Sequence, residues 1–185
     1  LHSDWQVDYY YGERRLTSSR GRSVSYVVND RHGTDGGFNP RFFEAIPEHP
    51  SYLREQLSLG VGECVYGFGE KFTHFVKNGQ TVDMWNSDGG TSSYQSYKCV
   101  PFFLTSGGWG VFVNSSGNVS FEAGSDVVSK ISFTLPGEEM EYYLIGGAEP
   151  KDVLRSYTSL TGRAPLVPRY TFGLWLSTSF TTDYS

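Results

Sequence analysis

Short apolar and β-branched runs recur between turn signals through most of this chain, and this recurrence constrains its fold more than any other feature. The runs occupy residues 64–66, 81–85, 99–105, 109–114, 119–122, 127–135 and 140–145. A spacing of about ten residues between short strands is typical of an antiparallel sandwich or barrel. The 22 glycines suit the tight turns of such a fold, because glycine adopts positive φ without steric cost. We therefore predict a mainly β fold of antiparallel strands.

Asn78-Gly79 is the clearest single turn signal in the sequence. A type I′ turn needs positive φ at both central residues, and Asn-Gly meets that need. We predict a hairpin that joins residues 72–76 to residues 81–85.

The N-terminal part of the chain divides into two segments. Residues 8–28 alternate polar and apolar side chains around Gly12 and Gly21, which predicts two or three short strands. Residues 29–50 contain a Gly-Gly pair and three prolines, and we interpret them as a long surface excursion. That excursion either shields a site or is a simple insertion.

One helix is predicted near the C-terminal end. Pro150 suits a first helical turn, and Gly162 suits a left-handed C-cap. Between them Val153, Tyr157 and Leu160 recur at helical spacing, which predicts one buried face.

A different pattern begins at about residue 165. Residues 163–168 contain two prolines and are expected to form a linker. Residues 170–176 are apolar at nearly every position. Such a run predicts a strand buried on both faces, as in a parallel barrel.

Charge and hydropathy exclude several classes of partner. The net charge is -5, and the longest basic run is the pair Arg14-Arg15, whereas a nucleic-acid surface needs a basic stripe. No apolar run approaches the roughly 20 residues that cross a bilayer. Cys64 and Cys99 have no accompanying His pair, so no metal site is expected. The two cysteines are either buried thiols or one disulfide.

Two stretches, Asn114-Ser115-Ser116 and Asn118-Val119-Ser120, fit the N-glycosylation pattern. They predict glycosylation at Asn114 and Asn118 and favour a secreted, extracellular glycoprotein. A bacterial protein with this sequence would instead be cytoplasmic.

The densest group of polar and aromatic residues covers residues 83–91. Trp85, Asn86 and Asp88 supply the aromatic face and the hydrogen-bonding oxygens that sugar binding uses. The alternative is an Asx-rich turn in which Asp88 bonds only its own backbone.

A second group, residues 177–183, is rich in Ser and Thr and follows directly after the apolar run. If that run is a strand of a (β/α)₈ barrel, its carboxyl end faces the active site, and Phe180 lies at the mouth of the pocket. The alternative is a solvent-exposed Ser/Thr-rich loop.

Other candidate sites carry less chemistry. The four histidines are scattered and have no matching nucleophile. Residues 67–71 (GFGEK) lack the third glycine of a phosphate-binding loop, so Glu70 and Lys71 are expected to be solvated or internally paired. No acidic pair is recognisable as the general acid and nucleophile that a glycosidase needs.

Several stretches share one order and spacing over nearly the whole chain. They are residues 51–57 (SYLREQL), 65–73 (VYGFGEKFT), 78–82 (NGQTV), 85–92 (WNSDGGTS), 125–130 (SDVVSK), 161–163 (TGR) and 172–182 (FGLWLSTSFTT). Read together, they resemble glycoside hydrolase family 31, and within it the α-xylosidases. Residues 29–50 depart from the family pattern, since they look longer.

The resemblance implies a galactose-mutarotase-like β-sandwich packed on a catalytic (β/α)₈, or TIM, barrel. Residues 1–164 would form the sandwich, incomplete at its start, and residues 165–185 the truncated start of the barrel. The family nucleophile and acid/base are aspartates on later barrel strands, so no catalytic residue is assigned in this chain.

The resemblance also implies two substrate-binding residues. Asp88 matches a sandwich-loop residue that reaches over the barrel mouth toward the sugar. Phe180 matches the aromatic that follows the first barrel strand and lines the innermost subsite. Xylose is glucose without its hydroxymethyl group, so a bulky ring in that space would exclude glucose.

The implied enzyme is a retaining α-xylosidase that releases terminal α-linked xylose from xyloglucan-type oligosaccharides by double displacement, without a cofactor or metal. Alternatives are an α-glucosidase or transglycosylase of the same family, or a non-catalytic carbohydrate-binding β-sandwich. The expected partners are an oligosaccharide substrate and the rest of the same polypeptide, and a homo-oligomer is compatible with both.

Overall fold

The computed structural model describes residues 5–28, 51–84 and 98–175. Within these ranges the strands are β1 (Gln6–Tyr11), β2 (Arg14–Arg20), β3 (Ser25–Val28), β4 (Ser51–Ser58), β5 (Val65–Gly69), β6 (Gln80–Met84), β7 (Cys99–Thr105), β8 (Trp109–Val113), β9 (Val119–Ala123), β10 (Lys130–Pro136) and β11 (Tyr142–Gly146). The helices are α2 (Pro150–Thr161) and the 3-10 helix η2 (Arg169–Phe172). All strand pairs are antiparallel, which confirms the predicted fold class.

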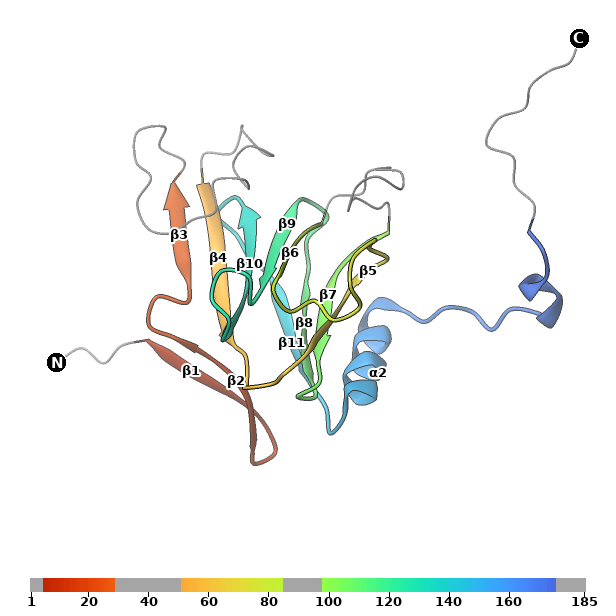
Figure 1. Cartoon of the computed structure of the whole chain (residues 1–185), viewed down its shortest axis with the longest axis horizontal. Helices are drawn as coiled ribbons and strands as arrows, with labels where there is room; N and C mark the ends of the chain where they lie inside the picture. Colours follow the sequence, from red (N-terminus) through yellow and green to blue (C-terminus); the bar gives the residue numbers. More distant parts are fainter. Residues whose placement is uncertain (1–4, 29–50, 85–97, 176–185) are drawn as a thin grey trace, which may run out of the picture.

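Two larger sheets stack as a sandwich (Figure 1). One has the strand order β3-β4-β10-β9-β6 and the other β11-β8-β7-β5. Aromatic side chains join them across the core, since the ring of Phe121 lies 4.8 Å from that of Phe68 and 6.1 Å from that of Phe103, centroid to centroid. All three rings are fully buried, and burying one Phe side chain is worth about 1.5–3 kcal/mol.

A third sheet, the β1–β2 hairpin, docks on β4 through hydroxyl groups. The Thr17 hydroxyl donates to the Ser58 carbonyl oxygen at 2.7 Å, and the Ser19 hydroxyl donates to Glu55 Oε1 at 2.8 Å. Thr17 and Ser19 are buried, so these bonds satisfy polar groups that water does not reach. The short strands predicted within residues 8–28 are confirmed.

The predicted hairpin across Asn78-Gly79 is wrong. Residues 72–76 form bends rather than a strand, and φ is positive at Gly79 but not at Asn78, so no type I′ turn forms. The Asn78 side chain instead accepts a hydrogen bond from the Val65 backbone N–H at 2.8 Å, and the Gly79 N–H donates to Ala123 at 2.7 Å. The turn therefore attaches β6 to β9, a partner distant in sequence.

Strand β4 was not predicted, because Arg54 and Glu55 interrupt its apolar pattern. Both side chains are buried. Arg54 lies 2.5 Å from the Glu122 carboxylate and 2.8 Å from that of Asp126. The sheet supplies charge partners from β9 and from the turn that follows it, so the charged residue is tolerated inside a strand.

Helix α2 is confirmed and covers the outer face of the four-stranded sheet (Figure 1). Val153 is buried, and the Tyr157 ring stacks on Phe102 with centroids 3.9 Å apart. The third predicted face residue, Leu160, is 51% exposed, so that part of the prediction is wrong.

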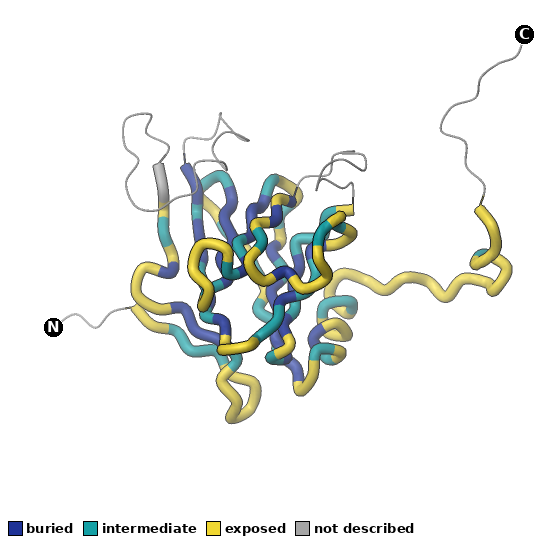
Figure 2. Tube along the Cα trace, in the orientation of Figure 1, coloured by how far each residue is buried: buried dark blue, intermediate teal, exposed yellow. Residues whose placement is uncertain are grey.

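The strand predicted for residues 170–176 is absent from its described part, which ends at Trp175. Residues 169–172 form the 3-10 helix η2, and Leu174 is 93% exposed. Figure 2 shows this segment exposed nearly throughout, away from the sandwich. A strand buried on both faces needs neighbouring strands for its backbone hydrogen bonds, and no described strand pairs with this segment.

Candidate functional site

Asp88 and Phe180, the two predicted substrate-binding residues, lie outside the described residues. The structure does show the frame around Asp88. Strand β6 ends at Met84 before the segment that carries Asp88, and β7 begins after it at Cys99. The two strands belong to different sheets, so the segment connects the two halves of the sandwich at one end.

A distorted stretch of β5 brings the chain to this end of the sandwich. Gly67, Phe68 and Gly69 all have positive φ, and their pairing with β7 is irregular. A Cβ at Gly67 would lie 2.6 Å from the carbonyl oxygen of Phe102, and a Cβ at Gly69 would collide with that of Lys98. Glycine is therefore required at both positions by the close approach of β7.

Phe68 is the one non-glycine residue with positive φ among those the structure describes. Such backbone conformations cost roughly 1–3 kcal/mol and persist only where surrounding contacts hold them. The contact here is the fully buried Phe68 ring, which packs against Phe121 and Phe103. The GFG sequence is thus a strained bulge rather than a phosphate-binding loop.

Lys71, just after the bulge, joins the two strands that flank the Asp88 segment. Its ammonium donates to the Asp83 carbonyl oxygen at 3.0 Å and to Cys99 Sγ at 2.8 Å. Next to it, Glu70 forms an exposed ion pair with Lys98 at 3.0 Å. Glu70 and Lys71 therefore do not pair with each other, but each ties the 70–71 stretch to the start of β7.

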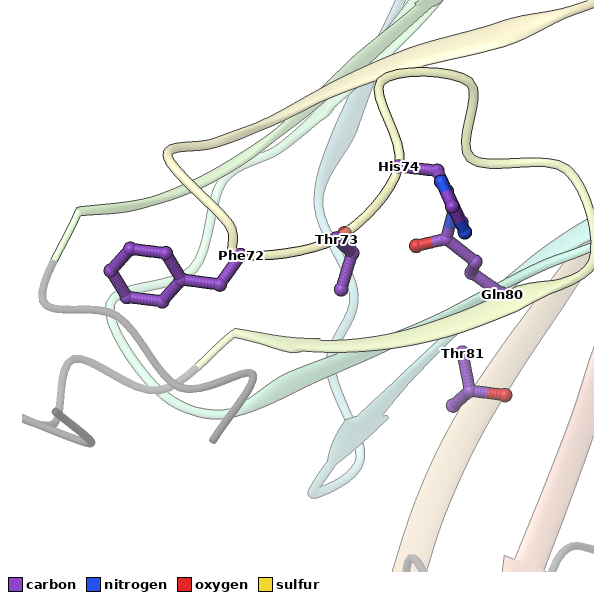
Figure 3. Close-up of a pocket in the computed structure, with 5 residues that line it drawn as sticks. All are labelled: Phe72, Thr73, His74, Gln80 and Thr81. Atoms are coloured by element: carbon purple, nitrogen blue, oxygen red, sulfur yellow. The ribbon is translucent and has the colours of Figure 1, made fainter. Parts of the chain in front are cut away.

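The loop that follows Lys71 borders a hollow of about 440 Å³. The described residues that line it are Phe72, Thr73, His74, Gln80 and Thr81. Figure 3 shows the Gln80 side chain rising from β6 toward the loop that carries Thr73 and His74. The ammonium of buried Lys77 donates to the Thr73 hydroxyl at 2.8 Å. Burial, with a smaller contribution from nearby Lys71, lowers the pKa of Lys77.

A second buried polar group lies between the β1–β2 hairpin and the sandwich. Burial raises the pKa of Glu55, although hydrogen bonds from Ser19 and Tyr142 oppose the shift. Burial also raises the pKa of Tyr142, whose hydroxyl lies 3.4 Å from that of Tyr9. Because Glu55 contacts Ser19 of β2 and Tyr142 of β11, this group of side chains fixes the hairpin to the sandwich.

The described residues contain no group of three His, Cys, Asp or Glu side chains arranged to hold a metal ion. Within the same ranges, no helix is both long and apolar enough to cross a membrane. Cys64 and Cys99 are half-buried thiols and do not form a disulfide with each other.

A family comparison identifies the sandwich. Residues 1–122 match the glycosyl hydrolase 31 N-terminal galactose mutarotase-like domain. The chain belongs to glycoside hydrolase family 31. The resemblance drawn from the sequence stretches is thereby confirmed, and so is the galactose-mutarotase-like type of the sandwich.

Two family 31 relatives are similar over most of the chain. It is 58% identical over 73% of its length to the α-xylosidase XylQ of Lactiplantibacillus pentosus. It is 45% identical over 93% of its length to an α-xylosidase of Emericella nidulans. The matched region covers 18% and 22% of these relatives, so the chain spans about a fifth of their length.

A solved family 31 structure shows the same architecture. The dextranase of Flavobacterium johnsoniae, crystallised as a mutant with isomaltotriose, matches with a TM-score of 0.70 and 26% identity. The match covers 91% of this chain and 19% of the dextranase chain. The described sandwich is therefore an N-terminal domain shared with enzymes that are named for different substrates.

The predicted glycosylation residues lie between β8 and β9. Asn114 is exposed, and its side-chain N–H donates to the Glu141 carboxylate at 3.1 Å. Asn118 is half-buried. Glycosylation at either residue stays a prediction.

Proposed function

We propose that this chain is the N-terminal part of a retaining α-xylosidase that releases terminal α-linked xylose from xyloglucan-type oligosaccharides. The observation that carries the proposal is the 58% and 45% identity to two relatives named α-xylosidase, one of them matched over 93% of the chain.

In this proposal the sandwich holds one wall of the sugar pocket, formed by Asp88. The support is the frame around it, in which Lys71 joins the end of β6 to the start of β7. Fixing both ends of a binding segment lowers the entropy that is lost when a ligand binds. The reaction needs two carboxylates about 5 Å apart, one as nucleophile and one as acid/base. We assign both to a TIM barrel that begins at about residue 165.

Selectivity for xylose is assigned to Phe180. A ring that fills the space of the missing hydroxymethyl group clashes with glucosides and packs on xylosides. One small group more or less on a substrate changes the free energy of binding in an apolar pocket by about 1–3 kcal/mol. Phe180→Ala should therefore raise the glucoside-to-xyloside ratio of kcat/KM about tenfold. An unchanged ratio would remove Phe180 from the specificity.

A second candidate is an α-glucosidase or transglycosylase of the same family. It is favoured by the structural similarity to a dextranase crystallised with isomaltotriose. The two candidates separate when the full-length protein is given aryl α-xylosides and α-glucosides. Preference for the glucoside overturns the first proposal, and binding of oligosaccharide with no hydrolysis of either substrate identifies a carbohydrate-binding sandwich instead.

We also propose that the protein, when made in a eukaryotic cell, is exported and carries glycans at Asn114 and Asn118. The exposure of Asn114 supports this assignment. Endoglycosidase treatment of the secreted protein should lower its mass, and Asn114→Gln should remove part of that change. Secreted protein of unchanged mass contradicts the proposal.

A further inference from the structure

The loop between Lys71 and Lys77 exposes two aromatic rings, and one of them lines the 440 Å³ hollow. Phe72, which lines the hollow, is 62% exposed, and Phe75 is 79% exposed. Exposed rings of this size are what a protein presents to the C–H face of a sugar. The volume falls in the range of about 300–1,000 Å³ that is typical of small-molecule sites.

Hydrogen-bonding groups converge on the same space. Gln80 Oε1 is buried and has no hydrogen-bond partner among the described residues, while its amide N–H donates to the Val76 carbonyl oxygen at 2.8 Å. In Figure 3 the Gln80 oxygen lies on the side of Thr73. The Thr73 hydroxyl accepts from Lys77, so its own hydrogen is free to donate elsewhere. The lining thus contains one acceptor without a partner among the described residues and one hydroxyl that can donate.

The described lining residues carry no carboxylate and no ammonium group. The nearby Lys77 is 4% exposed, and its ammonium is engaged by Thr73. The described lining therefore offers a cation no negative charge, and His74 is its one titratable side chain. A buried acceptor left without a partner costs free energy until a donor reaches it, and a sugar hydroxyl is such a donor.

We propose that this hollow is a carbohydrate-binding site and that it accepts one uncharged pyranose unit. Phe72 stacks on the ring face, Gln80 Oε1 accepts from a hydroxyl, and the Thr73 hydroxyl donates. The site does not depend on the reaction proposed above, because every group that defines it belongs to β6 and the loop before it.

The test is hydrogen–deuterium exchange of the full-length protein with and without cellotetraose, whose β-linkages an α-glycosidase leaves intact. Amides of residues 70–82 should be protected by the sugar. Phe72→Ala and Gln80→Met should each raise the half-saturating concentration about tenfold, the change expected when about 1.4 kcal/mol is lost. Phe75→Ala is the matched control, since it removes an exposed ring of the same loop that does not line the hollow.

Free xylose and free glucose test whether the site binds a monosaccharide or only a sugar unit within an oligosaccharide. Protection by either monosaccharide assigns the site to a single sugar, and protection by cellotetraose alone assigns it to a unit within a chain. Absence of protection at residues 70–82 with every sugar overturns the proposal. So does equal binding by Phe72→Ala and Phe75→Ala when exchange in β9 and β10 shows both variants folded. Hydrolysis of xylosides is measured in a separate assay. A protein without that activity can therefore still be tested for sugar binding at the hollow.

Discussion

Replacement of Gly69 by alanine tests whether the bulge in β5 is required by the close approach of β7. Gly69 has a φ of +80°, where a side chain costs roughly 1–2 kcal/mol. The new Cβ would also collide with the Lys98 carbonyl oxygen, and forcing atoms into a packed site adds about 1–3 kcal/mol. The sum is about 2–5 kcal/mol, or roughly a 30-fold to 5,000-fold increase in the equilibrium constant for local opening.

Gly79→Ala is the matched control. Gly79 also has a φ of +80°, but nothing lies within 4 Å of a Cβ built there. It should therefore show only the cost of positive φ, about 1–2 kcal/mol. The measurement is native-state hydrogen exchange in the full-length protein, which reports local opening, read at the β5 and β7 amides for Gly69→Ala and at the β6 and β9 amides for Gly79→Ala. Equal destabilisation by both variants would refute the steric explanation and leave only the backbone conformation.

Three further predictions follow from other contacts. Lys71→Met removes the ammonium between Asp83 and Cys99. We expect kcat/KM on an α-xyloside to fall about tenfold, because a charged hydrogen bond is worth about 1.5–3 kcal/mol. Full activity would show that this contact does not position the Asp88 segment. Burial raises the pKa of Glu55 above its ordinary 4.5. The contribution of Glu55 to folding stability is therefore fully present below pH 4.5 and is lost as the pH rises through the pKa of the folded protein. Glu55→Gln should remove this part of the pH dependence of the urea midpoint. The isolated 185-residue chain should melt without a sharp reversible transition, because the segment after α2 exposes several large apolar side chains; a cooperative calorimetric peak would contradict that.

The sequence predicted those features that depend on neighbouring residues. Recurrent short apolar runs predicted most of the strands, because side-chain alternation is a local property of a half-buried strand. Pro150 and Gly162 predicted the ends of α2 for the same reason, since helix caps involve only adjacent turns. The family followed from motif order, and with it came Asp88 and Phe180 as predicted substrate-binding residues.

Tertiary structure decided the features that depend on partners distant in the chain. Asn78-Gly79 has the composition of a local hairpin turn, yet Ala123 supplies the backbone partner and the hairpin does not form. Strand β4 was not predicted because it contains the charged residues Arg54 and Glu55. These side chains can be buried because other strands supply their partners. The hollow at Phe72 and Gln80 had no sequence signal, since it exists only where the loop passes over β6.

The conformation of Gly67-Phe68-Gly69 depends both on the local sequence and on partners distant in the chain. The two glycines are needed because the carbonyl oxygens of Phe102 and Lys98, about thirty residues further along the chain, leave no room for a Cβ. Local sequence determined which backbone angles were permitted there. Packing of Phe68 against Phe121 across the sandwich decided that the strained conformation is the one adopted, because only long-range burial offsets its cost.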